Sequence, residues 1–385
     1  MQTLGPIRFE GFLLDKTLTL GIMKIGDIIS DLEQWAPPFL QESYDNSGLI
    51  VGAKDWDTKG VLVALDCLEE VVDEAIDKDI RLIVTHHPIV FSGLKRFNGA
   101  NYIERVVMKA IKNDIAIYAI HTNLDNVHWG VNAKIIQILG LEKHSVLSPM
   151  KNSLKKFQVY VPSSHAESVE SAVFSAGGGK VSAYEECSFK SNGVGSFKGG
   201  KGTNPVIGEA GKREFVEEIK LEFIVPAFVV KDVERAARKA HPYEEMAFEW
   251  LPIENNATLY GAGAVGEFEK PIEFKTFLEV VKTAFGTTLK YTPSPKDTVQ
   301  RVAVCGGSGS FLLGAAKAVG ADVFITADYK YHQFFDADGT ISILDVGHFE
   351  SEQFTIDLIA DRLSEKFPKF AVLKTEVNTN PIQYY

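Results

Sequence analysis

The sequence predicts an α/β fold: a split α/β domain of two similar halves with parallel-rich sheets, interrupted by an inserted α+β ferredoxin-like domain. Apolar strands alternate with helices in both outer parts of the chain, which is typical of parallel strands covered on both faces. Between them, residues 151–253 follow a β-α-β-β-α-β order. The length of 385 residues also exceeds one ordinary hydrophobic core, so two domains are the starting expectation.

The first half is expected over residues 23–150. Residues 1–22 read as an N-terminal extension, because Met23-Lys24 resembles a second start, and no function is assigned to them. Periodicity predicts the helices, which Pro37-Pro38 and Gly140 help to end, and apolar runs predict the strands. The expected helices are 25–35, 68–78, 102–113 and 132–139, and the expected strands are 60–65, 80–84 and 115–120.

The inserted domain is expected from Lys151. Gly177-Gly-Gly179 ends its first helix. Residues 192–211 hold seven glycines and little apolar content, which indicates a long hairpin or a mobile loop. The expected strands are 157–161, 217–225 and 247–251, and the expected helices are 165–176 and 230–239.

The second half is expected over residues 254–385. Asp79–His86 resembles Ala321–Asp328, because both are buried strands with Thr near the end and a polar residue beyond it. This echo predicts two related half-domains that face each other. The expected strands are 299–304, 322–326 and 340–344, and helices are expected before Val319 and over 354–363.

The composition excludes several classes of protein. Hydrophobic residues make up 45% and charged residues 24%, as in soluble globular proteins. The net charge of -11 argues against nucleic acid or an anionic membrane surface as a partner. No apolar run approaches the ~20 residues that span a membrane. The three cysteines form no CxxC pair, which favours the cytoplasm over a secreted disulfide scaffold.

Polar residues directly after strands are the candidates for function, since ligands of open α/β sheets bind beyond the carboxyl ends of the strands. His86 and His87 follow the strand 80–84. Strand-end histidines are often structural, so a structural role and metal binding both stay open. Adjacent residues of an extended segment point to opposite sides, so the pair suits two ions better than one. Pro88 biases His87 towards that extended conformation.

A second candidate segment, His121 to Asp125, follows the strand 115–120. Asp125 alone would be read as a turn or helix-capping carboxylate. His121 is read either as a donor that supports a metal ligand or as an ordinary strand-end residue. His128 is read as a solvated loop residue.

A third segment follows the strand 340–344. His348 and Glu352 are four residues apart, so on a helix both project from one face. A histidine and a carboxylate at this spacing can bind one ion, or the carboxylate can bridge two. The alternative is a first-turn acid favoured by the helix dipole, which suits Glu350 better.

The glycine-rich stretch Gly306–Gly309 lies between a predicted strand and a helix. Its amides could cradle a phosphate or a carboxylate. It is neither a Walker A sequence nor GxGxxG, and a tight, close-packed turn is the equal alternative.

Taken together, three histidines and two carboxylates follow strands in both halves of the chain. Such a set suits a pair of divalent ions such as zinc, manganese or iron. Two such ions lower the pKa of water and polarise a substrate oxygen. The residues are His86, His87, Asp125, His348 and Glu352.

These residues lie in motifs that resemble the GTP cyclohydrolase 1 type 2 homologs, also called Nif-three-like proteins. The order and spacing of the motifs agree over nearly all of 23–385. His241-Pro-Tyr-Glu-Glu245 resembles the inserted domain of the longer bacterial members, which is similar to small trimeric signalling or metal-tolerance folds. The other matching segments are Tyr44-Asp-Asn-Ser-Gly-Leu49, Thr85-His-His-Pro88, His121-Thr-Asn-Leu-Asp125, Cys305-Gly-Gly-Ser-Gly309, Asp328-Tyr-Lys-Tyr-His332 and Asp345-Val-Gly-His-Phe-Glu-Ser-Glu352.

The resemblance implies two divalent metal ions per subunit, with Glu352 as the bridge between them. The implied ligands are His86, His87, Asp125, His348 and Glu352. The resemblance also implies a ring-shaped homohexamer, for which a trimer of dimers is one arrangement, with the sites facing an internal cavity. Lys330 and His332 are candidates for phosphate contact or proton transfer, with solvated surface residues as the alternative. Other catalytic residues are unknown.

The first functional hypothesis is a metal-dependent hydrolase of a nucleotide or a related heterocycle. In its GTP cyclohydrolase form it would open the imidazole ring of guanine at C8. The second is a metal-handling or regulatory protein, such as a metal chaperone or sensor, without turnover. A nucleic-acid-binding module is the third, and the net charge of -11 argues against it.

Overall fold

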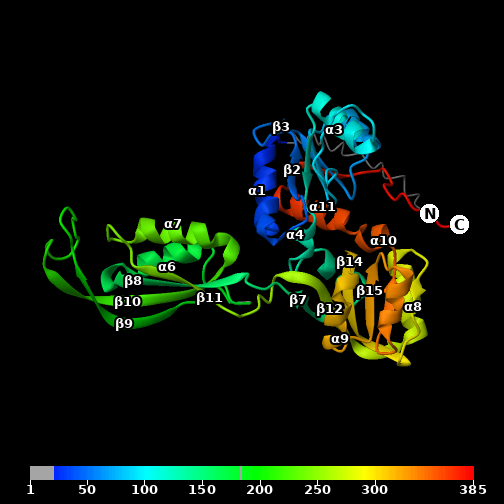
Figure 1. Cartoon of the computed structure of the whole chain (residues 1–385). Helices are drawn as coiled ribbons and strands as arrows, with labels where there is room; N and C mark the ends of the chain where they lie inside the picture. The colour runs from blue at the N-terminus through cyan, green and yellow to red at the C-terminus, as the bar shows by residue number, and fades with distance from the viewer. Residues whose placement is uncertain (1–20, 183) are drawn as a thin grey trace, which may run out of the picture.

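The computed structural model describes residues 21–182 and 184–385, so the predicted N-terminal extension lies outside the described residues apart from Gly21 and Ile22. Two α/β sheets lie next to each other, and an elongated α+β unit projects away from them (Figure 1). In the described part of the chain, no helix is long and apolar enough to cross a membrane.

The first sheet has the strand order β17-β4-β5-β6-β2. Strands β17, β4, β5 and β6 are parallel, and β2 joins β6 antiparallel. Alternate residues pack on opposite faces: Val63 and Val84 face α1 and α11, whereas Leu62 and Ile83 face α2 and α3. The bounds are β2 Gly48–Val51, β4 Gly60–Ala64, β5 Leu82–Thr85, β6 Ala116–Ala119, β17 Ala371–Lys374, α1 Ile25–Trp35, α2 Glu69–Asp77, α3 Tyr102–Lys112 and α11 Thr355–Lys366.

The second sheet has the order β13-β16-β15-β14-β12-β7. Strands β14, β15 and β16 are parallel, and the outer strands join antiparallel. Helices α5 and α8 cover one face and α9 the other. The bounds are α5 Val131–Ile138, β7 Glu142–Pro149, β12 Gly261–Glu273, α8 Phe274–Phe285, β13 Lys290–Tyr291, β14 Thr298–Ser308, α9 Leu313–Ala318, β15 Val323–Ala327 and β16 Ser342–Asp345.

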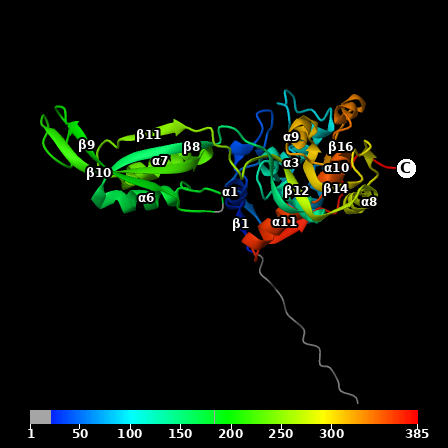
Figure 2. The same cartoon turned by 90° about the horizontal axis from the view of Figure 1, so that it is seen from below.

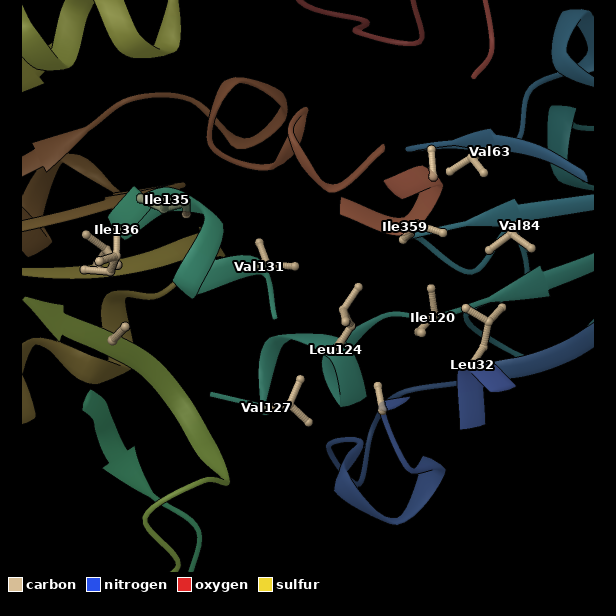
Figure 3. Close-up of a cluster of buried hydrophobic side chains, with 14 of the residues drawn as sticks. Leu32, Val63, Val84, Ile120, Leu124, Val127, Val131, Ile135, Ile136 and Ile359 are labelled. Atoms are coloured by element: carbon tan, nitrogen blue, oxygen red, sulfur yellow. The ribbon is translucent and has the colours of Figure 1, made fainter. Parts of the chain in front are cut away.

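The two sheets exchange strands across the boundaries expected from the sequence. Strand β17, near the C-terminus, pairs with β4 of the first sheet, and β7, which precedes the insert, pairs with β12 of the second. Figure 3 shows one buried apolar cluster that continues from Val84 of the first sheet through Leu124 and Val131 to Ile136 beside the second. This shared core anchors α4 (Thr122–Asp125), the short helix between the sheets.

Residues 154–252 form the projecting unit, in the order β8, α6, β9, β10, α7, β11. Its antiparallel sheet has the order β11-β8-β10-β9 and its own apolar core. It lies beside the two α/β sheets in both views, joined to them by two chain connections (Figures 1 and 2). The bounds are β8 Leu154–Pro162, α6 Ala166–Ser175, β9 Phe189–Lys198, β10 Arg213–Pro226, α7 Val230–Ala240 and β11 Phe248–Pro252.

Most expected elements are found within a few residues of their predicted bounds. Of the two alternatives for residues 192–211, the hairpin is the one observed, because β9 and β10 pair antiparallel on either side of the glycine-rich turn. The remaining short elements are β1 Met23–Lys24, β3 Asp57–Thr58, α10 His348–Glu352 and the 3-10 helices Pro38–Leu40, Ser163–His165, Ala227–Val229, Ser310–Leu312 and Tyr331–Ala337.

Candidate metal centre

The carboxyl ends of both sheets deliver polar side chains to one place. From the first sheet, His86 and His87 follow β5, and His121 follows β6. The amides of His86 and His87 donate to the carbonyls of Ala64 and Leu65, 3.3 and 3.0 Å away. The hydrogen bonding between β5 and the adjacent β4 therefore continues past the ends of both strands. Backbone hydrogen bonds therefore hold both histidines at the carboxyl end of the central strand β5.

From the second sheet, β16 ends at Asp345, whose carboxylate accepts hydrogen bonds from the amides of Tyr329 and Gly347 at 3.2 and 3.1 Å. The bond from Gly347 closes the turn into α10, which begins at His348, and the bond from Tyr329 ties this turn to the segment after β15. His348 and Glu352 project from one face of α10, as their spacing predicts, with a closest approach of 3.1 Å.

Glu352 lies at the centre of the cluster and presents a different oxygen to each side. Its Oε2 is 2.9 Å from Nε2 of His87 and 3.1 Å from Nε2 of His348. Its Oε1 is 3.7 Å from Nε2 of His86. That same His86 nitrogen is 3.6 Å from Oδ1 of Asp125, the last residue of α4. The five predicted residues therefore form two groups that share Glu352, and each group could hold a metal ion.

A separate hydrogen-bond acceptor fixes each imidazole ring through Nδ1. His86 donates to the carbonyl of Ile120 at 2.9 Å. His87, His121 and His348 pair with Asp66, Asp45 and Asp328, each at 2.7 Å. Because Nδ1 is engaged, Nε2 is the nitrogen left for a ligand, which is the usual arrangement of metal-bound histidine.

Among the described residues, two buried atoms of the cluster find no hydrogen-bond partner: Nε2 of His86 and Oδ1 of Asp125. An unpaired buried polar atom destabilises a fold by roughly 1–3 kcal/mol. In addition, Nε2 of His348 and Nε2 of His87 approach within 3.4 Å, although neither lone pair can bond the other without a proton or a cation between them. The donor set therefore fits divalent cations.

The protonation states of the protein without metal point the same way. Burial would lower the pKa of His87, but hydrogen bonds to Asp66 and Glu352 outweigh it and raise the pKa to about 9. Burial would likewise lower the pKa of His348, but hydrogen bonds to Asp328 and Glu352 outweigh it and raise the pKa to about 11. Protons on these rings therefore occupy the place of positive charge that a metal ion would take.

The two carboxyl groups behave oppositely. Burial and the charge of Glu352 raise the pKa of Asp125 well above its usual range. Burial also opposes ionisation of Glu352, but the surrounding His348, His86 and His87 hold its pKa well below the usual value. The histidines thus stabilise the charged form of Glu352, whereas at Asp125 burial and the charge of Glu352 outweigh them.

The glycine-rich stretch has a packing role. The amides of Gly306 and Gly307 donate to Oδ1 of Asn132 and Oγ of Ser351, at 3.0 and 2.9 Å, so neither is free to cradle a ligand. Gly307 has φ +60°, and a Cβ there would lie 2.3 Å from Oε1 of Glu352. The close-packed turn is thus the alternative that fits, and its glycine makes room for Glu352.

His121 was not predicted as a metal ligand from the sequence, and neither were the aspartates that hold the histidine rings. His121 forms a group with His86 and His87 that could also hold an ion. Asp45 lies in a quoted motif, Tyr44–Leu49, which was a usable signal, whereas Asp66 follows β4 with no motif around it. His128 makes an edge contact with the ring of His144, 4.1 Å between centroids, away from the centre.

A cavity of about 830 Å³ lies over the centre. His87, His121, His348, Asp125 and Glu352 all line it, and His86 is buried behind them. Lys330 and His332 are exposed and do not belong to its lining.

The fold and the cluster together define an α/β protein with a buried histidine–carboxylate centre that could hold divalent metal. The chain belongs to the Duf34/NIF3 (NGG1p interacting factor 3) family, which it matches over residues 23–381.

Relatives described as "GTP cyclohydrolase 1 type 2 homolog" support this assignment. The Bacillus subtilis protein is 37% identical over 364 residues, which cover 93% of this chain and 97% of the relative. The Halalkalibacterium halodurans protein is 38% identical over 372 residues, covering 94% and 100%. A solved Bacillus cereus protein related to NIF3 is 35% identical, with a TM-score of 0.81 and coverage of 94% and 99%.

Proposed function

We propose that this protein is a hydrolase that uses two divalent metal ions to open a C–N bond in a heterocycle. The observation that carries the proposal is the position of Glu352, whose two oxygens face two separate groups of nitrogen and oxygen donors. The name of the curated relatives, GTP cyclohydrolase 1 type 2 homolog, supports a reaction of the same type.

In this proposal, His86, Asp125 and Glu352 hold one ion, and His87, His348 and Glu352 hold the other. Three protein ligands leave further positions of each ion open, as in catalytic rather than structural sites. When bound, such ions lower the pKa of water and stabilise negative charge on a substrate oxygen. Zinc, manganese and iron all suit imidazole and carboxylate donors.

His121 is the residue we assign to proton transfer. Its Nδ1 is held by the carboxylate of Asp45 at 2.7 Å, and its ring lines the cavity beside His86 and His87. Asp45 also accepts from Oγ of Ser47 and from the amide of Thr122, so it cannot easily leave the ring. An aspartate that orients one ring nitrogen leaves the other able to take and deliver a proton.

The reaction balances with one water and no redox partner. The ring C–N bond breaks, the hydroxyl of water bonds to the carbon, and the remaining hydrogen ends on the released nitrogen. His121 would carry that proton from the water to the nitrogen. Lys330 and His332 have no part in this scheme, because both lie outside the cavity lining.

We further propose that residues 23–150 and 254–385 form one metal-binding domain with two related halves. Residues 151–253 would be an inserted ferredoxin-like domain, which the β-α-β-β-α-β order and the strand order of its sheet support. A homohexamer in which the cavities face inwards is the assembly to test, by light scattering.

The first test is metal analysis of the purified protein, followed by assay of cyclic amides and amidines with that metal restored. We expect two ions per chain and turnover that a chelator abolishes. Metal-loaded protein that turns over none of these compounds, but passes its ions to an acceptor protein, would instead favour a metal-handling role. A Glu217→Gln variant, altered at an exposed position of the projecting unit, is the matched control for site variants.

A further inference from the structure

We propose that the cavity takes an uncharged, planar heterocycle, stacked on aromatic side chains at its mouth, and discriminates against nucleoside triphosphates. The inference deepens the proposed hydrolase, because it names the substrate class for the same centre. It rests on the charge and the side chains of the cavity, which binding experiments test without any turnover.

The described lining of the cavity contains no lysine and no arginine. It contains four carboxylates: Glu42, Asp66, Asp125 and Glu352. Two more, Asp45 and Asp328, lie directly behind His121 and His348. Together they are six carboxylates, and two divalent ions bring only four positive charges, so the loaded site keeps a negative balance while its histidines stay neutral. A triphosphate chain would add like charge to this negative site, which disfavours its binding.

Two amides of the glycine-rich stretch are engaged within the protein and are not available to a phosphate. The amides of Gly306 and Gly307 are already bonded to Asn132 and Ser351. Phosphate sites of this type depend on free amides at the end of a strand or the beginning of a helix. The candidate cations Lys330 and His332 are also outside the lining. The described lining thus contains neither candidate cation, and Gly306, which does line the cavity, has its amide already bonded.

The mouth of the cavity is instead aromatic. Tyr44, Phe91, Tyr102 and Phe311 all line it, and they are 60%, 50%, 52% and 67% exposed. The rings of Tyr44 and Phe91 lie 6.2 Å apart, and Phe91 lies 6.4 Å from the ring of His121. Exposed aromatic faces that lead from solvent to a buried polar centre suit a planar ring, which stacks on them through its own π face.

The volume is also adequate. About 830 Å³ lies within the range of roughly 300–1,000 Å³ that small-molecule sites occupy, so a base or a nucleoside fits without crowding. Size alone would admit a nucleotide as well. The discrimination we propose therefore comes from charge, and the retention of the ring comes from stacking.

The test compares inosine with inosine 5′-triphosphate, which contain the same nucleoside and differ only in the phosphate chain. Binding to the metal-loaded full-length protein would be followed by calorimetry, with metal content measured before and after each titration. We expect inosine and hypoxanthine to bind, and the triphosphate to bind at least ten-fold more weakly. Triphosphate binding that matches or exceeds that of inosine, or no binding of either uncharged compound, would overturn the proposal.

Variants separate stacking from metal binding. Phe91→Ala and Tyr44→Ala should each weaken inosine binding roughly ten-fold, the usual size of a lost base–aromatic contact, with metal content unchanged. Phe91→Tyr and Tyr44→Phe should retain binding. Phe335→Ala is the matched control, because Phe335 is 68% exposed and lies outside the cavity lining. Unchanged affinity in both alanine variants would contradict the stacking role. Inosine binding together with no turnover of any cyclic amide or amidine would defeat the proposed hydrolase and leave the present inference standing.

Discussion

The metal centre and the projecting unit of residues 154–252 are stabilised in opposite ways. The unit has a continuous apolar core between its sheet and the helices α6 and α7. The centre buries Glu352, His86 and part of Asp125 together, and two of its polar atoms lack partners. In the described residues of the projecting unit, no group of histidine, cysteine or carboxylate side chains is placed to hold an ion. Metal should therefore matter greatly for the centre and hardly at all for the unit.

The largest expected effect comes from Glu352→Gln, which changes the one residue shared by both ligand groups. Both ions should be lost and turnover abolished, because each group then keeps only two charged or basic donors and loses its bridge. Metal analysis and circular dichroism would be measured together, since the apolar strands should still fold. His348→Ala should also lose metal. The control Glu217→Gln should match the unmodified protein, and metal retained in both site variants would refute the ligand assignment.

The next effect concerns His121. If it carries the proton, His121→Ala should lower kcat by about 10²–10⁴-fold while both ions remain bound. The measurement is a pair of values for each variant, kcat and metal content. His165→Ala supplies the control, because His165 is exposed in the projecting unit and its ring bonds the neighbouring Ser164, far from the centre. Loss of metal from His121→Ala would instead show that His121 is a metal ligand, the sixth residue of the centre.

A smaller effect is expected at Gly307, where glycine admits Glu352. Gly307→Ala would place a methyl group 2.3 Å from Oε1 of Glu352 at a backbone φ of +60°. We expect metal affinity to fall roughly 10–100-fold, which is the usual effect of changing a residue that contacts and orients a metal ligand. Gly339→Ala is the matched control, because Gly339 has the same φ of +60° and no described atom lies within 4 Å of a Cβ there. Equal metal affinity in the two variants would show that Glu352 can shift without cost.

The smallest effect is in pH dependence. The pKa values of His87 and His348, about 9 and about 11, are raised above the usual value in the metal-free protein. The stability that these protonated rings contribute is complete below about pH 6.5, the unfolded value, and is lost as pH rises through 9 and then 11. Metal must displace the same protons, so it binds more tightly as pH rises.

This single competition between protons and metal increases the stabilisation by metal between pH 6 and pH 9. The difference in Tm between metal-loaded and chelated protein should therefore grow by several degrees over this range. Amide hydrogen exchange in β8 and β10 should not depend on metal at any pH. A difference in Tm that shrinks with pH would contradict the proposed displacement of protons.

Local patterns were enough to predict most elements and the five central residues. Periodicity located α1 at Ile25–Trp35, and polar residues after strands located His86, His87, Asp125, His348 and Glu352, which the fold does bring together. The position of β17 beside β4 was not predictable in the same way, because pairing between strands distant in sequence leaves no local pattern. The expected halves therefore appeared more separate than the sheets are.

The supporting aspartates were missed for a related reason. Asp66 meets His87 across 21 residues of sequence, and Asp328 meets His348 across 20, so neither pair has a helical or strand spacing to reveal it. The packing of Gly307 against Glu352 likewise depends on the meeting of β14 with α10. The sequence shows a glycine at 307 and a glutamate at 352, but it does not show that the two are in contact.

The central claim is that two ions share Glu352, and electron paramagnetic resonance of manganese-loaded protein tests it most directly. Two ions held by one bridging carboxylate lie about 3.5–4 Å apart and couple magnetically. The account predicts two Mn²⁺ per chain and the spectrum of a coupled pair, which Glu352→Gln abolishes. One Mn²⁺ per chain, or two with the six-line spectrum of isolated ions, would contradict it.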